Sequence, residues 1–129
     1  MAHVLVVDDE MAIRQSLRLL LEDAGHVVLE ASNGQDALAC LRRSPHRLVT
    51  LLDVQMPVLD GFAVLRAVAR EPDLASQHAY VLVTAFPDRL FSSSLATLLT
   101  SQLAVPVIGK PFELDAILAT VASAARRLG

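Results

Sequence analysis

Five short hydrophobic segments are spaced along the chain. They span residues 4–7, 27–29, 48–52, 79–83 and 105–108, and each is too short to form a stable helix by itself. Within each segment the apolar residues are continuous and do not alternate with polar ones. This is typical of parallel strands whose two faces are both covered by helices. The pattern therefore predicts a five-stranded parallel sheet.

Helical patterns lie between these strands. The clearest one contains Ile13 and ends before Gly25, with apolar residues on one face and charged residues on the other. Further helices are expected over residues 35–43, 62–70 and 113–127. Strands that alternate with helices predict an α/β fold, a flavodoxin-like, doubly wound five-stranded parallel sheet with strand order 2-1-3-4-5. At 129 residues, we expect a single domain over residues 1–129.

Polar residues directly follow the predicted strands. Asp8 and Asp9 come after the first strand, Asp53 after the third, Thr84 after the fourth and Lys110 after the fifth. Ligands of open α/β sheets bind beyond the carboxyl ends of the strands, so these side chains are expected at one edge. Three ionised carboxylates with one lysine leave a net negative charge, which is unfavourable in a partly buried cleft. This favours a bound cation, and Mg²⁺ suits oxygen ligands.

The chemistry of these residues suggests phosphoryl transfer. A carboxylate can attack phosphorus in line and form an acyl phosphate, which makes Asp53 the candidate nucleophile. A metal ion, Lys110 and the hydroxyl of Thr84 would then stabilise charge on the phosphoryl oxygens. Each residue also has a simpler interpretation: Asp9 as a helix N-cap, Thr84 as the last residue of a strand, Lys110 as a solvated charge. Their combination at one sheet edge favours the functional interpretation.

Four short motifs in the expected order resemble those of bacterial response-regulator receiver domains, which belong to the CheY-like superfamily. They are Val-Asp-Asp-Glu at 7–10, Leu-Asp-Val-Gln-Met-Pro-Val-Leu-Asp-Gly at 52–61, Val-Thr-Ala at 83–85 and Lys-Pro-Phe at 110–112. The resemblance covers essentially the whole chain. Each motif is weak alone, but together they are specific.

The resemblance implies a role for each matching acidic position. Asp53 would be the phosphoacceptor and Asp9 a direct Mg²⁺ ligand. Asp8 would be a second or water-mediated ligand, and the backbone carbonyl of Gln55 a further one. The phosphoryl group would come from a sensor histidine kinase or a histidine phosphotransfer protein.

The second half of the chain carries both matches and departures. Thr84 and Lys110 would contact the phosphoryl group, and the Lys110–Pro111 peptide bond would be cis. Receivers usually carry an aromatic residue three positions before the lysine, where this chain has Val107. We therefore expect a readout that differs from the usual coupling of threonine and aromatic residue, through the face around the fourth helix, the fifth strand and the fifth helix. Phe86 is expected at the mouth of the site, where it would slow hydrolysis of the acyl phosphate.

Composition narrows the partners and the location. The formal charge is -3 with 11 Lys and Arg residues, and no basic stripe suggests direct contact with nucleic acid. The chain has no apolar run long enough for a membrane span, and a single cysteine, Cys40, which together suggest a cytoplasmic protein. We expect a signalling switch that assists its own phosphorylation, with an unidentified downstream protein as its target, and not a turnover enzyme. Homodimer formation stays open.

Three alternatives remain at this point. The chain could be the receiver segment of a larger response regulator or hybrid kinase. It could be a receiver-like binding module that works without phosphorylation, for which Val107 is the warning sign. A Mg²⁺-dependent hydrolase with an aspartyl nucleophile would instead be expected to carry that nucleophile after the first strand, together with a substrate-binding cap.

Overall fold

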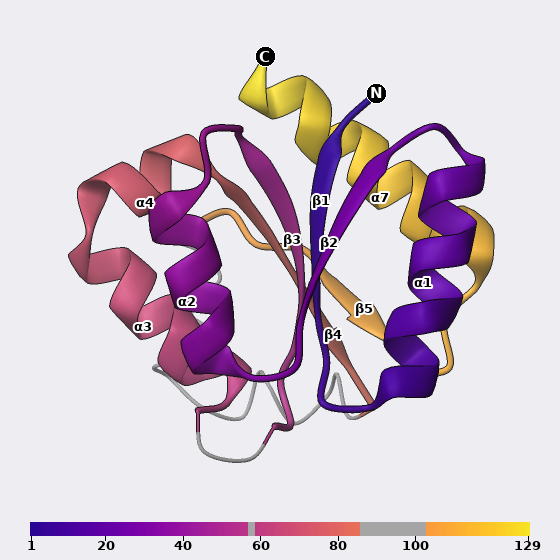
Figure 1. Cartoon of the computed structure of the whole chain (residues 1–129), viewed down its shortest axis with the longest axis horizontal. Helices are drawn as coiled ribbons and strands as arrows, with labels where there is room; N and C mark the ends of the chain where they lie inside the picture. Colours follow the sequence, from indigo (N-terminus) through magenta and orange to yellow (C-terminus); the bar gives the residue numbers. More distant parts are fainter. Residues whose placement is uncertain (57–58, 86–102) are drawn as a thin grey trace.

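A computed structural model describes residues 1–56, 59–85 and 103–129 of the chain (Figure 1). Its centre is a five-stranded sheet in the order β2-β1-β3-β4-β5, in which every neighbouring pair is parallel. The strands are β1 (His3–Val7), β2 (Val27–Ala31), β3 (Leu48–Asp53), β4 (Ala79–Thr84) and β5 (Val107–Gly109). The predicted fold class and strand order are confirmed.

Helices cover both faces of the sheet. They are α1 (Met11–Asp23), α2 (Gly34–Arg43), α3 (Gly61–Arg70), α4 (Pro72–Gln77) and α7 (Leu114–Leu128). Figure 1 shows α1 and α7 on one side of the sheet and α2, α3 and α4 on the other. Within the described ranges, none of these helices combines the length and the apolar character needed to cross a membrane.

The inner strands are the most deeply buried part of the molecule. Every residue of β3 is buried, and Leu5 and Val7 of β1 pack with Leu52 and Leu82 in the core layer beneath α2 and α3. A second apolar cluster lies on the other face of the sheet, beneath α1 and α7. Full burial of one leucine side chain contributes about 1.5–3 kcal/mol. These two layers hold the carboxyl ends of β1 and β3 in place.

Most element boundaries lie within one residue of the sequence-based expectations, and the larger differences are in β2, β5 and α4. Strand β2 continues to Ala31, and β5 begins at Val107 and not at 105. The shorter β5 has a physical reason, since Pro106 has no N–H to donate to a neighbouring strand. The short helix α4 was not predicted, although Pro72 in its first turn is a recognised start signal.

The turn between β3 and α3 brings a helix start against the end of the central strand. The carboxylate of Asp60 caps α3 by accepting a hydrogen bond from the backbone N–H of Ala63 at 2.8 Å. Gly61 follows, and a Cβ added there would lie 2.6 Å from the backbone oxygen of Asp53. The absence of a side chain at Gly61 therefore lets α3 begin directly beside the end of β3.

Candidate functional site

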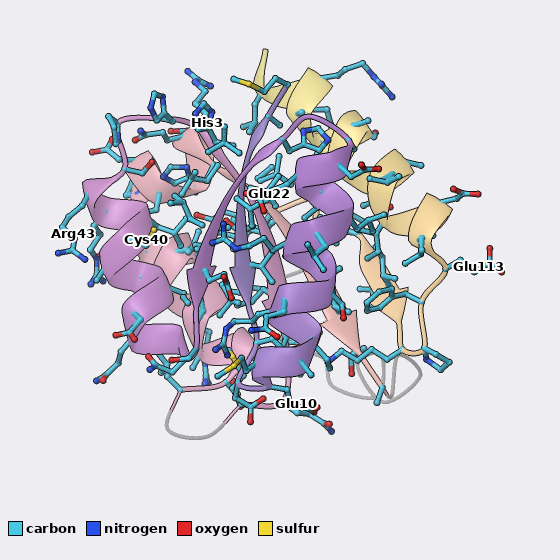
Figure 2. The ribbon with its side chains drawn as sticks, turned by 45° about the vertical axis from the view of Figure 1, so that its right-hand side comes forward. His3, Glu10, Glu22, Cys40, Arg43 and Glu113 are labelled. Atoms are coloured by element: carbon cyan, nitrogen blue, oxygen red, sulfur yellow. The ribbon has the colours of Figure 1, made fainter. Side chains whose placement is uncertain are left out.

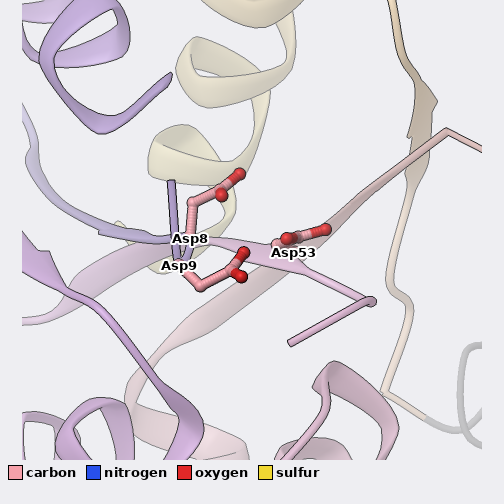
Figure 3. Close-up of side chains that lie close together, drawn as sticks. All are labelled: Asp8, Asp9 and Asp53. Carbon is pink, nitrogen blue, oxygen red and sulfur yellow. The ribbon is translucent and has the colours of Figure 1, made fainter. Parts of the chain in front are cut away.

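Three carboxylates meet at the carboxyl ends of β1 and β3. One oxygen from each of Asp8, Asp9 and Asp53 can be chosen so that all three lie within 4.8 Å of one another. Figure 3 shows the three side chains gathered around a common space. Asp8 and Asp53 are only 3% and 6% exposed, whereas Asp9 is exposed to solvent. The structure thus brings together residues that the sequence placed at separate strand ends.

Asp8 is held by hydrogen bonds around both its side chain and its backbone. Its Oδ1 accepts from the backbone N–H of Glu10 at 2.9 Å, and its Oδ2 accepts from Nζ of Lys110 at 3.0 Å. Its N–H donates to the carbonyl of Ala31 at 3.2 Å, and its carbonyl accepts from Nη1 of Arg14 at 2.7 Å. Hydrogen bonds therefore fix both the side chain and the backbone of Asp8.

Lys110 reaches the cluster from the loop after β5. Its Nζ lies 3.0 Å from Oδ2 of Asp8 and 3.5 Å from Oδ1 of Asp53, and its side chain is 18% exposed. Burial lowers the pKa of Lys110, but the hydrogen bond that Lys110 donates to Asp8 and the charge of Asp53 outweigh this effect and raise the pKa above its ordinary value. The backbone N–H of Lys110 donates to the carbonyl of Thr84, and the peptide bond to Pro111 is cis. The lysine is a part-buried ion-pair partner and not a solvated surface charge.

The buried carboxylate of Asp53 is electrostatically unfavourable in its ionised form. Burial is the main cause that raises its pKa to about 6, and the nearby charge of Asp8 adds to it. Lys110 and the backbone N–H of Gln55, which donates to Oδ1 of Asp53 at 3.3 Å, oppose this rise only in part. Excess negative charge among hard oxygen donors is the environment that a small divalent cation would relieve, so the donor set fits Mg²⁺.

The alternative role of Asp9 as a helix cap does not hold. Helix α1 begins at Met11, and its N-cap residue is Glu10, which makes no side-chain capping hydrogen bond. Figure 2 labels Glu10 at the start of α1, beside the end of the sheet that carries the acidic cluster. The exposed carboxylate of Asp9 is therefore not explained by helix capping.

Two of the remaining sequence candidates lie in β4 and β5. Thr84 ends β4, is 1% exposed and pairs with Gly109 of β5. Val107 is half-buried at the start of β5, where it pairs with Leu82. Phe86 and the fourth helix expected between the fourth and fifth strands lie outside the described residues, and this expected helix is not α4.

Sequence reasoning missed one contact of the site, made by Arg14. Nothing in the motifs singles this residue out, and on the helical pattern it is one more charge on the polar face of α1. Its contact with the carbonyl of Asp8 depends on how α1 packs beside β1 and β2, which the sequence pattern does not specify.

Comparison with known proteins decides the family. The sequence profile described as the response regulator receiver domain matches residues 4–122. The chain belongs to this family. It is thus a receiver domain of the kind found in two-component response regulators.

Individual relatives agree with this assignment. The chain is 35% identical to the uncharacterized transcriptional regulatory protein YkoG of Bacillus subtilis (strain 168), over 98% of this chain and 52% of that protein. It spans a smaller share of several other curated relatives. The chemotaxis protein CheY4 of Vibrio cholerae superposes with a TM-score of 0.79 at 30% identity, over 96% of this chain and 98% of that one.

A second solved structure bears on the metal. The response regulator protein TrrA of Thermotoga maritima, solved in complex with Mg²⁺-BeF, has a TM-score of 0.77 and 27% identity to this chain. The similarity covers 95% of this chain and 98% of that one. A receiver domain with the same fold therefore holds magnesium.

Proposed function

We propose that this receiver domain accepts a phosphoryl group on the carboxylate of Asp53, with Mg²⁺ bound by the acidic cluster. One observation carries the proposal. A buried aspartate at the end of the central strand lies beside two further aspartates, and its Oδ1 is 3.5 Å from the ammonium group of Lys110. Asp8, Asp9, Asp53 and the backbone carbonyl of Gln55 would provide the ligands.

The proposed reaction moves the phosphoryl group from a phosphohistidine to Asp53. An oxygen of the Asp53 carboxylate attacks phosphorus in line, a P–O bond forms, and the P–N bond to the histidine breaks. The leaving imidazole nitrogen keeps the electron pair and takes a proton from solvent. Asp53 has to be ionised to attack, and a pKa of about 6 leaves most of it ionised at neutral pH. Bound Mg²⁺ would neutralise charge on the phosphoryl oxygens.

Lys110 and Thr84 would stabilise the product. The ammonium of Lys110 bridges Asp8 and Asp53, so a phosphoryl group on Asp53 would lie within its reach. Thr84 is the last residue of β4, the strand next to β3, and carries a hydroxyl that can donate a hydrogen bond to a phosphoryl oxygen. The backbone hydrogen bond from Lys110 to Thr84 would couple movement of one residue toward the phosphoryl group to movement of the other.

The proposed setting is a cytoplasmic phosphorelay. The donor would be a sensor histidine kinase or a histidine phosphotransfer protein, as the family membership suggests. The domain would act as a switch that passes the signal to a downstream protein through the surface around β5 and α7. The chain could do this as a single-domain regulator or as the receiver part of a longer protein.

A second candidate function is a binding module that works without phosphorylation. Val107 favours it, because a half-buried valine stands where the aromatic switch residue is expected. This module would keep the fold and the acidic cluster but would not respond to a phosphodonor.

Intact mass spectrometry tests the proposal. The protein is incubated with a small-molecule phosphodonor, with Mg²⁺ or with a chelator, beside Asp53→Asn and the control Asp115→Asn in the first turn of α7. We expect one phosphoryl addition that requires Mg²⁺ and Asp53 and that the control retains. No addition with either the small donor or a phosphorylated kinase would instead support the binding module.

A further inference from the structure

One arginine joins the acidic cluster to two other elements. Nη1 of Arg14, on α1, donates to the carbonyl oxygen of Asp8 at 2.7 Å. Nε of the same side chain donates to Oε1 of Glu30, on β2, at 3.1 Å. The side chain is only 14% exposed, so this contact is better shielded from water than an ordinary surface ion pair. A single guanidinium thus connects the end of β1, helix α1 and strand β2.

Glu30 fixes the orientation of that guanidinium. It pairs with Val6 in the sheet, and its second oxygen accepts from Nε of Arg18 at 2.7 Å. The hydrogen bond from Arg18 is the main cause that lowers the pKa of Glu30, and Arg14 adds to it against the effect of burial. Glu30 therefore stays ionised, and its charge offsets that of Arg14 next to the cluster.

The bond to Asp8 acts on the peptide unit that Asp8 shares with Asp9. A peptide unit is planar, so holding the carbonyl oxygen of Asp8 sets the plane from which the backbone of Asp9 continues. Asp9 is exposed, so packing alone does little to determine where its carboxylate lies. The contact from Arg14 is thus well placed to set this geometry.

We infer that Arg14 is a positioning residue that, held by Glu30, orients the Asp8–Asp9 turn for a divalent cation. The inference rests on the proposed function, because it concerns the same Mg²⁺ site. Arg14 itself would not contact the metal ion. Its role is to keep Asp9 where its carboxylate faces that of Asp53.

The chain offers a matched control in Arg18. This residue also pairs with Glu30 from α1, and it contacts Glu22 at 3.4 Å. Within the described part of the chain, its side-chain hydrogen bonds go to these two glutamates and not to Asp8. Arg14→Ala and Arg18→Ala each remove one ion pair between α1 and β2. Only Arg14→Ala also removes the hydrogen bond to the backbone carbonyl of Asp8.

Two readouts test the inference. The first is Mg²⁺ titration followed by the NMR shifts of backbone amides near Asp53. We expect Arg14→Ala to weaken Mg²⁺ binding roughly tenfold, the size seen when a partner that orients a metal ligand is removed. Arg18→Ala should stay within about twofold of the unchanged protein. Arg14→Lys keeps the positive charge but lacks the planar guanidinium that bonds to both Asp8 and Glu30. We expect it to weaken Mg²⁺ binding nearly as much as Arg14→Ala does.

The second readout needs no metal. Amide hydrogen exchange at Asp9 and Glu10 should be faster in Arg14→Ala than in Arg18→Ala, with thermal unfolding measured to show that both are folded. Equal Mg²⁺ affinity, tighter binding or an equal loss in the two variants would overturn the inference. If the unchanged protein binds no Mg²⁺, the proposed function fails, and the exchange rates alone then support or overturn the positioning role.

Discussion

The two sides of the proposed phosphorylation site are built differently. On the acceptor side, which carries Asp8, Asp9 and Asp53, β3 is buried along its whole length and β1 is paired with strands on both of its edges. On the lysine side, β5 has only three residues, all half-buried, and within the described residues it pairs with β4 alone. The acceptor side is therefore held by a fully buried strand, whereas the lysine side follows a short strand whose residues are only partly buried.

This difference suggests a division of labour. Segments with few buried contacts open or shift at low free-energy cost, and moving elements are drawn from them. Lys110 follows β5, and its backbone N–H donates a hydrogen bond to the carbonyl of Thr84. Addition of a phosphoryl group to Asp53 would therefore shift the lysine side before it shifts the acceptor side.

A cavity in the acceptor side should cost the most stability. Leu52 is fully buried and directly precedes Asp53. Leu52→Ala should lower the free energy of unfolding by about 2–5 kcal/mol, as large-to-small changes in a core do. Val107→Ala, at a half-buried position, should cost no more than about 1 kcal/mol. Urea denaturation of both variants checks this, and equal losses would remove the contrast.

A methyl group at Gly61 should disturb the acceptor itself. The added Cβ would lie 2.6 Å from the backbone oxygen of Asp53 and 2.9 Å from Cα of Val54, so the end of β3 has to shift. We expect Gly61→Ala to cost roughly 1–3 kcal/mol of stability and to weaken Mg²⁺ binding. Gly34→Ala is the control, since its Cβ would meet the backbone of Leu59 at 2.6 Å. It should cost similar stability but leave Mg²⁺ binding unchanged.

The buried charge of Asp53 should make stability depend on pH when Mg²⁺ is absent. Its folded pKa of about 6 lies above the ordinary value of 3.8, so between these values the folded state binds the proton more tightly than the unfolded state. Stability is therefore lost as the pH rises through this window, and Asp53→Asn avoids the loss. The variant should gain on the order of 1–2 kcal/mol over the unchanged protein between about pH 4 and 7.

Denaturation curves at several pH values, in the presence of a chelator, measure this gain. Taking the difference between the two proteins cancels the titration of the shared groups that do not interact with Asp53. If the difference in unfolding free energy between the two proteins stays flat or shrinks with rising pH, the pKa of Asp53 is not raised in the folded state.

Phosphorylation should produce the smallest effect, and only on the lysine side. Amide exchange over residues 103–110 should change by a few-fold when Asp53 carries the phosphoryl group, whereas exchange in β1 and β3 should stay the same. Exchange measured by mass spectrometry on both forms checks this. Identical exchange over this segment would rule out a readout through β5.

The hydrophobic pattern was sufficient for the sheet because the inner strands are buried on both faces. Strands such as Leu48–Asp53 appear in the sequence as continuous apolar runs. The rule that ligands bind beyond the strand ends then placed Asp8 and Asp53 at one edge. The cis bond before Pro111 and the candidate role of the Gln55 carbonyl came from the family resemblance and not from the pattern.

Other features depend on tertiary packing, which the pattern does not contain. The six-residue helix α4 is too short to give a clear helical period. The bonds from Arg14 to Asp8 and Glu30 require the relative positions of a helix and two strands. Long charged side chains on a polar helix face look alike in a sequence, so a structure was needed to separate Arg14 from Arg18.

In the proposed function, Asp53 carries the phosphoryl group as an acyl phosphate. Borohydride reduces an acyl phosphate to the alcohol, so treating the phosphorylated protein with it should convert the modified aspartate to homoserine. Peptide mass spectrometry would then locate the change. We expect homoserine at position 53, only after incubation with phosphodonor and Mg²⁺. Homoserine at another aspartate, or none in a protein whose intact mass has risen by one phosphoryl group, would contradict it.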